Sequence, residues 1–268
     1  MNTLTLGASR IGYEIKTYFR QGDTVFFTFL FPLVMLLIFS VAFSEASFGE
    51  YPNGDTVSAA AFYLPAMLAA GLLLSGLQNL AIDIANEKSD GTLKRFAGTP
   101  LPVVSYFIGK IGVVLVTGVL QAALLIAVAA IAFQVPLPTE VGAWATYGWV
   151  FLFGVTTSAV LGIALSGLPR SGKSATAVII PITLVLQFIS GVYLQFTSLP
   201  EWLQNVASVF PLKWMAQGTR SVFLPEGFEA LEQGETWNLG GIAIALGVWL
   251  VVGLVVTRLT FRWIRKDS

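Results

Sequence analysis

Six long apolar segments constrain the fold of this chain more than any other feature. A helix needs about 20 mainly apolar residues to cross roughly 30 Å of hydrocarbon. Only 11% of the 268 residues are charged, against about 25% in soluble domains, and the mean hydropathy is +0.77. We therefore predict an all-α membrane protein with six spanning helices. The predicted spans, none with a charge near its centre, are residues 25–44, 58–82, 104–133, 143–167, 175–196 and 239–261.

The chain is interpreted as a single membrane domain over residues 1–268. Apolar residues recur every three to four positions before the first span, with the charged residues on other faces. This spacing predicts an amphipathic helix along the membrane surface, and a merely polar tail is the alternative. The recurring residues are Leu4, Ala8, Ile11, Ile15 and Tyr18. The predicted parts are an interface helix (1–24), five spans (25–196), an external re-entrant hairpin (197–238), and the last span with its tail (239–268).

The segment before the last span is predicted to form a short helical hairpin. Two amphipathic pieces, residues 201–210 and 212–223, are broken at Pro211, and each is too short to span. Their apolar residues favour a hairpin that dips into the outer leaflet. We expect an external gate formed by Pro211, Trp214 and Arg220, with simple interfacial anchoring as the alternative.

The positions of the basic residues predict the topology. Every Lys and Arg except Lys213 and Arg220 lies on one side if both termini are cytoplasmic, and the opposite loops carry acidic residues. Basic residues are enriched in cytoplasmic loops. We therefore predict that both ends are cytoplasmic.

The composition lacks several residue types that catalytic and metal sites commonly use. The chain has no cysteine and no histidine, which removes thiolate sites and the commonest general base and zinc ligand. Asp83 lies at the cytoplasmic end of the second span, and Lys110 is expected to snorkel from the start of the third. We therefore expect no catalytic residue, no metal site and no cofactor bound by this chain, and an integral membrane enzyme is disfavoured.

Uncharged polar residues do occur inside the predicted spans. They serve either as interhelical hydrogen bonds or as the lining of a substrate pathway. For the pathway the best candidates are Gln78, Gln121 and Gln187, because a buried amide must find a partner.

One match to a nucleotide-binding motif is interpreted as coincidental. Residues 167–174 read GLPRSGKS and fit the phosphate-loop pattern. No strand precedes them, and the chain has no room for a nucleotide-binding sheet. We predict a tight turn in which Arg170 and Lys173 follow the positive-inside pattern.

The first cytoplasmic loop, residues 83–102, is a candidate attachment point for an external motor. Residues 85–88 extend the second span, residues 89–91 turn, and residues 92–97 are predicted to form a short helix. Thr92 is expected to cap that helix, with Lys94 and Arg95 exposed. A short helix held between two spans makes a lever, and an ordinary solvated loop is the alternative.

Several stretches resemble the type 2 ABC transporter permeases, the membrane half of ATP-driven exporters. The most specific is the loop EKSDGTLKR at 87–95, followed by Thr99-Pro100-Leu101. Phe31-Pro32, the stretch 190–200, and Phe210-Pro211-Leu212 with Arg220 also match. The resemblance implies six spans, a coupling helix in that loop and two short external helices. It assigns ATPase coupling to Glu87, Lys88, Gly91, Thr92, Leu93, Lys94 and Arg95.

The resemblance also implies partners and a function. Two separate ATPase subunits would carry ATP and Mg, and a second permease subunit would form a dimer with this chain in a bacterial or archaeal plasma membrane. No nucleic acid is expected. The residues 18–27 are similar to the daunorubicin-exporter branch, which implies export of a lipophilic drug or lipid-like solute. Permeases for lipid-linked polysaccharide or teichoic acid, and a non-transporting membrane sensor or scaffold, remain alternatives.

Overall fold

The computed structural model describes residues 3–52 and 54–261, and within these ranges it contains helices and loops but no strand. Helix η1 is a π-helix, and η2 and η3 are 3-10 helices. The helices are α1 (Thr3–Arg20), α2 (Gly22–Ala42), α3 (Ala59–Leu73), η1 (Leu74–Asn79), α4 (Leu80–Ser89), α5 (Thr92–Ala97), α6 (Val103–Ala132), α7 (Val141–Leu165), α8 (Gly172–Ile189), η2 (Phe196–Ser198), α9 (Glu201–Ala207), α10 (Pro211–Phe223), η3 (Phe228–Leu231) and α11 (Leu239–Thr260).

Six helical segments are long and apolar enough to cross a membrane, which confirms the predicted all-α, six-span fold. The second segment runs unbroken through α3, η1 and α4 to Ser89, so the helix continues past residue 82, as predicted for residues 85–88. The segments are Gly22–Ala42, Ala59–Ser89, Val103–Ala132, Val141–Leu165, Gly172–Ile189 and Leu239–Thr260.

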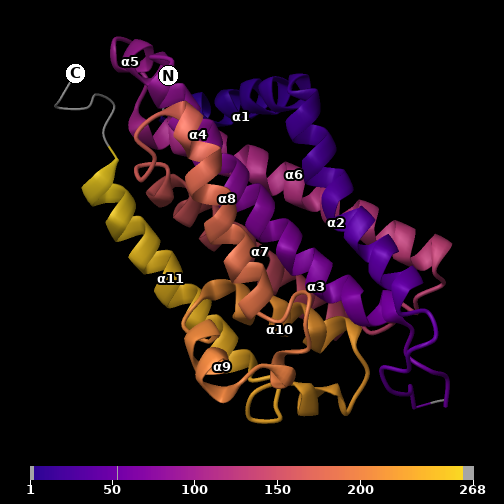
Figure 1. The fold of residues 1–268 in the computed structure, drawn as a ribbon. Coiled ribbons are helices and arrows are strands. Elements are labelled where there is room, and N and C mark those ends of the chain that lie inside the picture. The colour runs from indigo at the N-terminus through magenta and orange to yellow at the C-terminus, as the bar shows by residue number, and fades with distance from the viewer. Residues whose placement is uncertain (1–2, 53, 262–268) are drawn as a thin grey trace.

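The second span is the axis of the molecule. All of its most apolar stretch is buried inside the protein, whereas only 17% of the corresponding stretch of α11 and 22% of that of α2 are buried. Helices α2, α6, α7, α8 and α10 all contact this axis (Figure 1). A helix that is apolar all round fits this central position, because it meets protein on every side.

Glycines allow the backbones of the second span and α7 to pack in close contact. A Cβ atom added to Gly162 would meet the carbonyl oxygen of Gly76, and one added to Gly76 would meet Ser158. Small residues at such positions let two helices pack closely where no hydrophobic effect draws them together. The contact falls in the π-helical turn η1, where the chain already departs from regular helical geometry.

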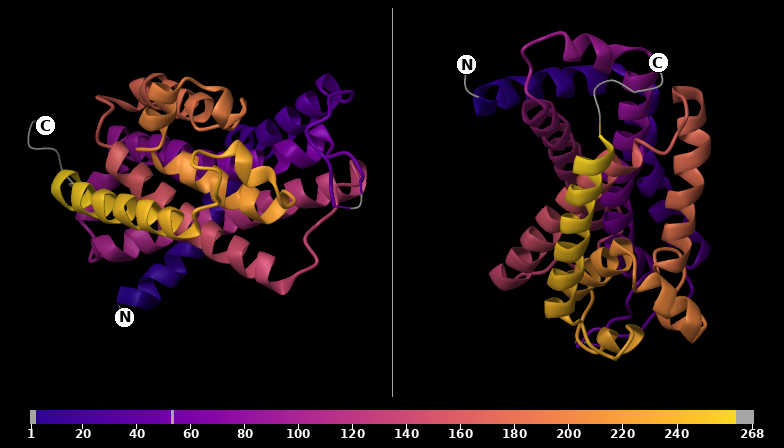
Figure 2. Two further views of the ribbon diagram at one scale, coloured as in Figure 1. Left: turned by 90° about the horizontal axis from the view of Figure 1, so that it is seen from below. Right: turned by 90° about the vertical axis from the view of Figure 1, so that its left-hand side faces the viewer.

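Helix α1 crosses one end of the bundle and packs on α6 (Figures 1 and 2). A Cβ on Gly7 would lie 2.8 Å from Ile108, so the two helices are in close contact. Leu4, on the predicted apolar stripe, is 67% exposed and remains available to lipid, whereas Glu14 is only 4% exposed. The face of α1 that contacts α6 combines Ile11, from the predicted apolar stripe, with Arg10 and Glu14, and the sequence did not predict that these two charged residues contact the protein.

The opposite end is closed by α9 and α10 (Figure 1). The two short helices match the two predicted pieces, except that Pro211, predicted as the break between them, is the first residue of the second helix. Proline suits this position because its missing N–H has no partner in a first helical turn. Most of α10 is buried against α3, α7 and α11. The predicted hairpin is therefore a packed part of the domain.

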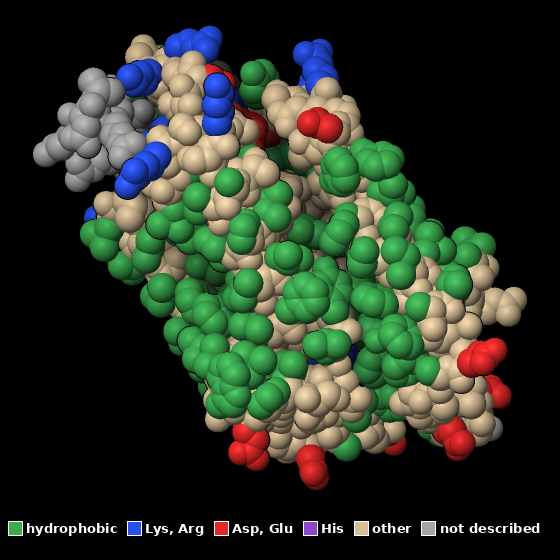
Figure 3. Space-filling model, in the orientation of Figure 1, with side chains coloured by type: hydrophobic (Ala, Val, Ile, Leu, Met, Phe, Trp, Pro, Cys, Tyr) green, Lys and Arg blue, Asp and Glu red, His purple; other side chains and the backbone are tan. Residues whose placement is uncertain are grey.

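The two ends differ in charge. Figure 3 shows Lys and Arg side chains gathered at the end with α1 and α5, Asp and Glu at the end with α9 and α10, and an apolar belt between them. We call these the basic end and the acidic end. The last turn of α11 also lies at the basic end, the same end as α1 (Figure 1).

Candidate functional sites at the two ends of the membrane domain

A buried lysine organises the basic end. Lys110, on α6, is 1% exposed and donates hydrogen bonds from Nζ to three carboxylates. The acceptors are Glu14 Oε2 at 2.8 Å, Asp83 Oδ2 at 2.6 Å and Glu87 Oε1 at 2.7 Å. An ammonium group has three donors, so all of them are used. The expectation that Lys110 snorkels to the surface was wrong, because α1 and α4 cover it and supply the anions.

The surrounding side chains extend this cluster to α5. Arg10 pairs with Glu14 at 2.7 Å, and its guanidinium lies 4.3 Å from the centre of the Phe96 ring on α5. Tyr106 donates to the second carboxylate oxygen of Glu87 at 2.6 Å. We call Arg10, Glu14, Asp83, Glu87 and Lys110 the basic-end cluster. It joins α1, α4 and α6 through ion pairs, and α5 through the ring contact.

The three acids of this cluster have the spacing of a cation site. Their ligand oxygens lie within 4.8 Å of one another. The Lys110 ammonium already bonds to each of them. The Lys110 ammonium therefore occupies the position that a metal ion would need.

The predicted coupling loop forms a helix with one inward and one outward face. Gly91 turns the chain with a φ of +81°, which favours glycine, and α5 follows. Leu93 is buried, whereas Lys94 and Arg95 are exposed. The expectation that Thr92 caps α5 was wrong, because Gly91 holds the cap position and Asp90 accepts the Thr92 N–H at 2.8 Å.

The residues assigned to coupling therefore divide into two groups. Glu87 and Leu93 fasten the loop to the membrane domain, whereas Lys94 and Arg95 are presented outward. Lys88 and Gly91 are half-buried near the turn. Their coupling role stays a prediction.

The π-helical turn η1 directs polar side chains to three different spans. Ser75 donates to Gln121 on α6 at 3.1 Å. Gln78 accepts from Thr183 on α8, and Asn79 donates to Thr28 on α2 at 2.7 Å. Helix η1 continues directly into α4, which carries Asp83 and Glu87 of the basic-end cluster. The second span therefore links this cluster to the three spans.

The amides proposed for a substrate pathway are all engaged in such contacts. Gln121 also donates to the backbone oxygen of Thr28 at 2.6 Å, and the absence of a side chain on Gly71 leaves room for it. Gln187 accepts from Tyr193 and donates to the Thr183 carbonyl at 3.3 Å. These bonds hold helices together, and a pathway role for Gln78, Gln121 and Gln187 stays a prediction.

The phosphate-loop match lies in the turn between α7 and α8. Ser171 caps α8 and forms a capping box with Ser174. Helix α7 precedes the turn, so the strand that such a site requires is missing here. The turn is explained by helix capping.

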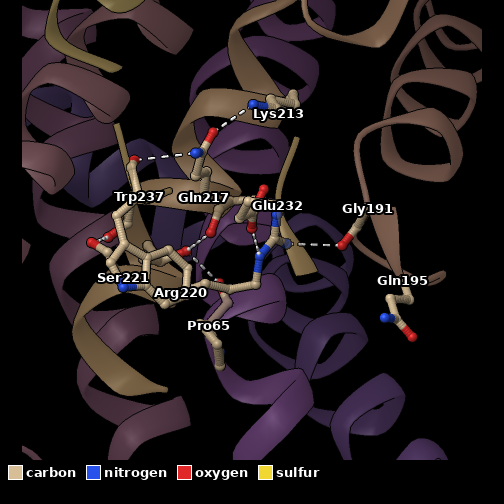
Figure 4. Close-up of polar contacts among 12 residues, drawn as sticks. Pro65, Gly191, Gln195, Lys213, Gln217, Arg220, Ser221, Glu232 and Trp237 are labelled. Atoms are coloured by element: carbon tan, nitrogen blue, oxygen red, sulfur yellow. Dashed lines mark hydrogen bonds and ion pairs between the residues drawn. The ribbon is translucent and has the colours of Figure 1, made fainter. Parts of the chain in front are cut away.

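At the acidic end a second set of charged side chains is buried. Arg220, on α10, pairs through Nε with Glu232 at 2.5 Å and donates from Nη1 to the Gly191 carbonyl at 3.0 Å (Figure 4). Gly191 has a φ of +75° at the end of α8, which turns the chain back toward η2. Trp214, another predicted gate residue, donates to the Ser208 carbonyl at 2.8 Å. Arg220 and Trp214 thus brace the hairpin, and their gating role stays a prediction.

Lys213 belongs to this end and was missed as a site residue. It is 1% exposed and donates to Gln217, with its ammonium 4.1 Å from the Trp214 ring and 5.3 Å from the Phe196 ring (Figure 4). Burial lowers the pKa of Lys213 to about 8. We call Lys213, Arg220 and Glu232 the acidic-end cluster. The sequence held a signal for it, because Lys213 and Arg220 are the two exceptions to the predicted charge asymmetry.

Six apolar spans around a buried central span, with polar contacts inside and charged clusters at both ends, define a multi-pass membrane protein. The chain belongs to the ABC-2 family of transporter proteins, because the family model described as "ABC-2 family transporter protein" matches residues 47–261.

Curated relatives agree with this family. The protein named "Probable multidrug ABC transporter permease YbhR" is 22% identical over 186 residues, both in Escherichia coli strain K12 and in Escherichia coli O157:H7. The alignment covers 69% of this chain and 50% of each relative. The chain thus spans about half the length of the curated relatives it matches.

Proposed function

We propose that this chain is the transmembrane subunit of an ATP-driven exporter that moves a lipophilic drug or a lipid-like solute out of the cell. ATP and Mg bind to two separate ATPase subunits, and a second copy of this chain completes the pathway. The family and the naming of the relatives as multidrug permeases support this function. Export in the manner of daunorubicin exporters is the specific form that the resemblance at residues 18–27 favours.

The coupling proposal rests on the contacts that hold α5 against the membrane domain. Leu93 anchors this short helix, and the basic-end cluster connects its neighbourhood to α1 and α6 by buried ion pairs. A force applied to the exposed Lys94 and Arg95 is therefore passed to the interface helix α1 and the spanning helix α6, because buried ion pairs resist separation. The π-helical turn then passes a movement of α4 to α2, α6 and α8 through its side-chain bonds.

The decisive experiment is co-purification with candidate ABC ATPases in detergent, followed by ATP hydrolysis with and without lipophilic drugs. Reversing charge at Lys94 and Arg95 (K94E/R95E) is expected to weaken ATPase capture roughly tenfold or more, because both side chains face outward. Lys173→Glu is the matched control: it reverses an exposed charge at the same end, outside the loop. Equal capture by the double variant and the control would contradict the coupling role.

The same assay separates the alternative functions. Hydrolysis stimulated by drugs supports the exporter, whereas stimulation only by a lipid-linked glycan would indicate a polysaccharide or teichoic acid permease. Capture without stimulation by any solute would indicate a sensor or scaffold. Failure to capture any ATPase would overturn the transporter proposal.

We also propose that the basic end faces the cytoplasm. The chain has no cysteine, so single cysteines can be introduced for labelling. Lys94→Cys at the basic end and Glu140→Cys at the acidic end both replace exposed residues. In intact cells an impermeant maleimide is expected to label only Glu140→Cys. The reverse pattern would invert the topology.

A further inference from the structure

Helix α1 has three faces, and the protein covers only one of them. The covered face packs on α6 through Gly7 and Ile11. It also carries Arg10 and Glu14 of the basic-end cluster. Each helical residue is rotated by about 100° from the one before it, so residues three and four apart share a face. The two remaining faces of α1 are exposed, one apolar and one polar.

The first exposed face is apolar. Leu4 is 67% exposed and Phe19 is 44% exposed. Ala8 is exposed as well, and Ile15 is half-buried between them. Their spacing of four, seven and four residues puts the four side chains within about 60° of one another around the helix axis. We call Leu4, Ala8, Ile15 and Phe19 the free apolar face of α1.

The free apolar face points in the direction in which the spans run. Its last residue, Phe19, stacks on Phe29, with the ring centroids 6.4 Å apart. Phe29 lies two turns into α2, about 10 Å along the first span. In the other direction, Arg10 contacts Phe96 of α5, which lies beyond α1 at the tip of the basic end (Figures 1 and 2). The free apolar face is therefore directed at the level of the apolar belt.

The second exposed face is polar and basic. Lys16 and Arg20 are exposed and lie one helical turn apart, beside the free apolar face. Neither forms an ion pair with a described residue. Glu14, the only acid of α1, is buried in the basic-end cluster, and Asp23, at the start of α2, forms no ion pair with Arg20. Two unbalanced positive charges therefore border an apolar surface.

Continuity with the first span favours a bilayer as the occupant of both exposed faces. One residue, Gln21, separates α1 from α2, so Arg20 lies within a turn of the start of that span. Phe26 and Phe27, early in the span, are 56% and 65% exposed and continue the apolar surface of α1. A bilayer contacts the apolar surface and the basic residues together, whereas a soluble partner reaches only the polar face.

We propose that α1 is a phospholipid-binding element in the leaflet at the basic end. Its free apolar face enters the acyl region, and Lys16 and Arg20 bind the phosphate groups of anionic phospholipids. Long basic side chains suit this position, because their apolar stems lie along acyl chains while the charged ends reach the headgroups. Basic amphipathic helices in the plane of an interface favour anionic lipids for this reason. The proposal requires a bilayer but neither an ATPase nor a transported solute, so it is independent of the proposed function.

Neighbouring single cysteines test the orientation of α1, since the chain has no cysteine of its own. Ala8→Cys lies on the free apolar face and Ser9→Cys on the polar face, and both replace exposed residues. Each variant is spin-labelled and reconstituted in vesicles of phosphatidylcholine and phosphatidylglycerol. The label of Ala8→Cys is expected to collide with oxygen, which concentrates in hydrocarbon, and that of Ser9→Cys with a water-soluble nickel chelate. Equal accessibility of both labels to the nickel chelate would overturn the proposal.

The headgroup preference is measured at Gly12, which lies between the two exposed faces. A Cβ added there meets nothing within 4 Å, so Gly12→Cys can carry a fluorophore. Phospholipids with a nitroxide in the acyl chain quench this fluorophore, and the phosphatidylglycerol and phosphatidylcholine forms are compared at equal mole fraction. Two basic residues near the surface are expected to enrich the anionic form roughly 5- to 30-fold around the label.

Variants in the Gly12→Cys background assign this preference to its residues. K16Q/R20Q is expected to bring the two lipids to equal quenching, whereas K16R/R20K, which keeps both charges, retains the enrichment. The matched control K94Q/R95Q removes two exposed charges from α5 at the same end and is also expected to retain it.

Unchanged enrichment in K16Q/R20Q would overturn the proposal. Loss of ATPase capture by K16Q/R20Q with an unchanged lipid preference would indicate a protein partner at this face, and would overturn it as well. The lipid preference and the coupling role of α5 are removed by different pairs of substitutions, so the two proposals can fail separately.

Discussion

The two charged clusters, at opposite ends of one membrane domain, are built in different ways. The basic-end cluster joins residues from three elements that are 23 to 96 positions apart in the sequence, and its lysine uses all three donors. The acidic-end cluster is local, since Arg220 and Glu232 are 12 positions apart. Buried atoms without a hydrogen-bond partner occur in both clusters, on Arg220 and Glu232 at this end and on Arg10 at the basic end.

This difference separates two physical roles. A cluster whose lysine pairs with acids from distant elements fixes the relative positions of helices, because pulling them apart exposes buried charges. A cluster with an excess positive charge and unpaired atoms gains free energy when a suitable partner arrives. The basic-end cluster thus holds α1, α4 and α6 together, whereas the acidic-end cluster carries an excess of buried positive charge.

The largest expected effect tests the basic end. Lys110→Met leaves three carboxylates within 4.8 Å of one another without their central cation. A loss of about 3–5 kcal/mol in stability is expected, because breaking a buried ion pair leaves uncompensated charge. Thermal unfolding in detergent measures it, and Lys16→Met, at an exposed position on α1, is the control. Equal melting temperatures for the two variants would show that the basic-end cluster does not contribute to stability.

The middle of the molecule, which connects the two ends, is expected to be next in sensitivity. Gly162→Ala places a Cβ against the carbonyl oxygens of Gly76 and Leu77. Overpacking of this kind costs about 1–3 kcal/mol. Gly148→Ala, also on α7, meets nothing within 4 Å and serves as the control. If both alanines lower the melting temperature equally, the close packing of η1 on α7 is not important for stability.

The sequence predicted what depends on local composition. The six spans follow from hydropathy alone, because every backbone polar group in hydrocarbon must be satisfied within a helix. The hairpin follows from two short amphipathic pieces and Pro211, and the turn and helix of the loop follow from Gly91 and its neighbours. Each of these features is determined within about 20 residues of chain.

What the sequence did not predict depends on distant contacts. Lys110 reads as a snorkelling lysine until α1, nearly a hundred residues away, is placed over it with Glu14. The π-helical turn likewise reflects tertiary packing, since Ser75 and Asn79 bond to two different spans. Lys213 could have been found, because a basic residue on the wrong side of a strong charge asymmetry requires a compensating environment.

The acidic end is expected to respond to pH through Lys213. Lys213 faces Gln217, Trp214 and Phe196, with Arg220 and Glu232 as the charged neighbours. Its pKa of about 8 lies below the 10.5 of an unfolded lysine. Between these values the unfolded chain binds more protons, so the stability contributed by this group rises with pH and levels off above 10.5.

Lys213→Met isolates this contribution. Subtracting the variant's melting curves from those of the parent between pH 7 and 10 removes the titration of all other groups. The parent is expected to gain roughly 1–3 kcal/mol relative to the variant over this range. A difference that does not change with pH would mean that Lys213 titrates normally and that the excess charge at the acidic end is absent.

The smallest expected effect concerns the polar connection between the ends. Thr28→Val removes the hydroxyl that accepts from Asn79 and keeps the side-chain volume close to constant. Interhelical hydrogen bonds in membranes are worth about 0.6 kcal/mol on average, so a shift in melting temperature of only a few degrees is expected. Thr156→Val, at a half-buried threonine whose hydroxyl donates to the Leu152 carbonyl of its own helix, is the matched control. If Thr28→Val is nearly neutral for stability yet lowers drug-stimulated hydrolysis by the assembled complex, the bond transmits movement from the basic end. If both remain unchanged, the spans follow the axis through packing alone.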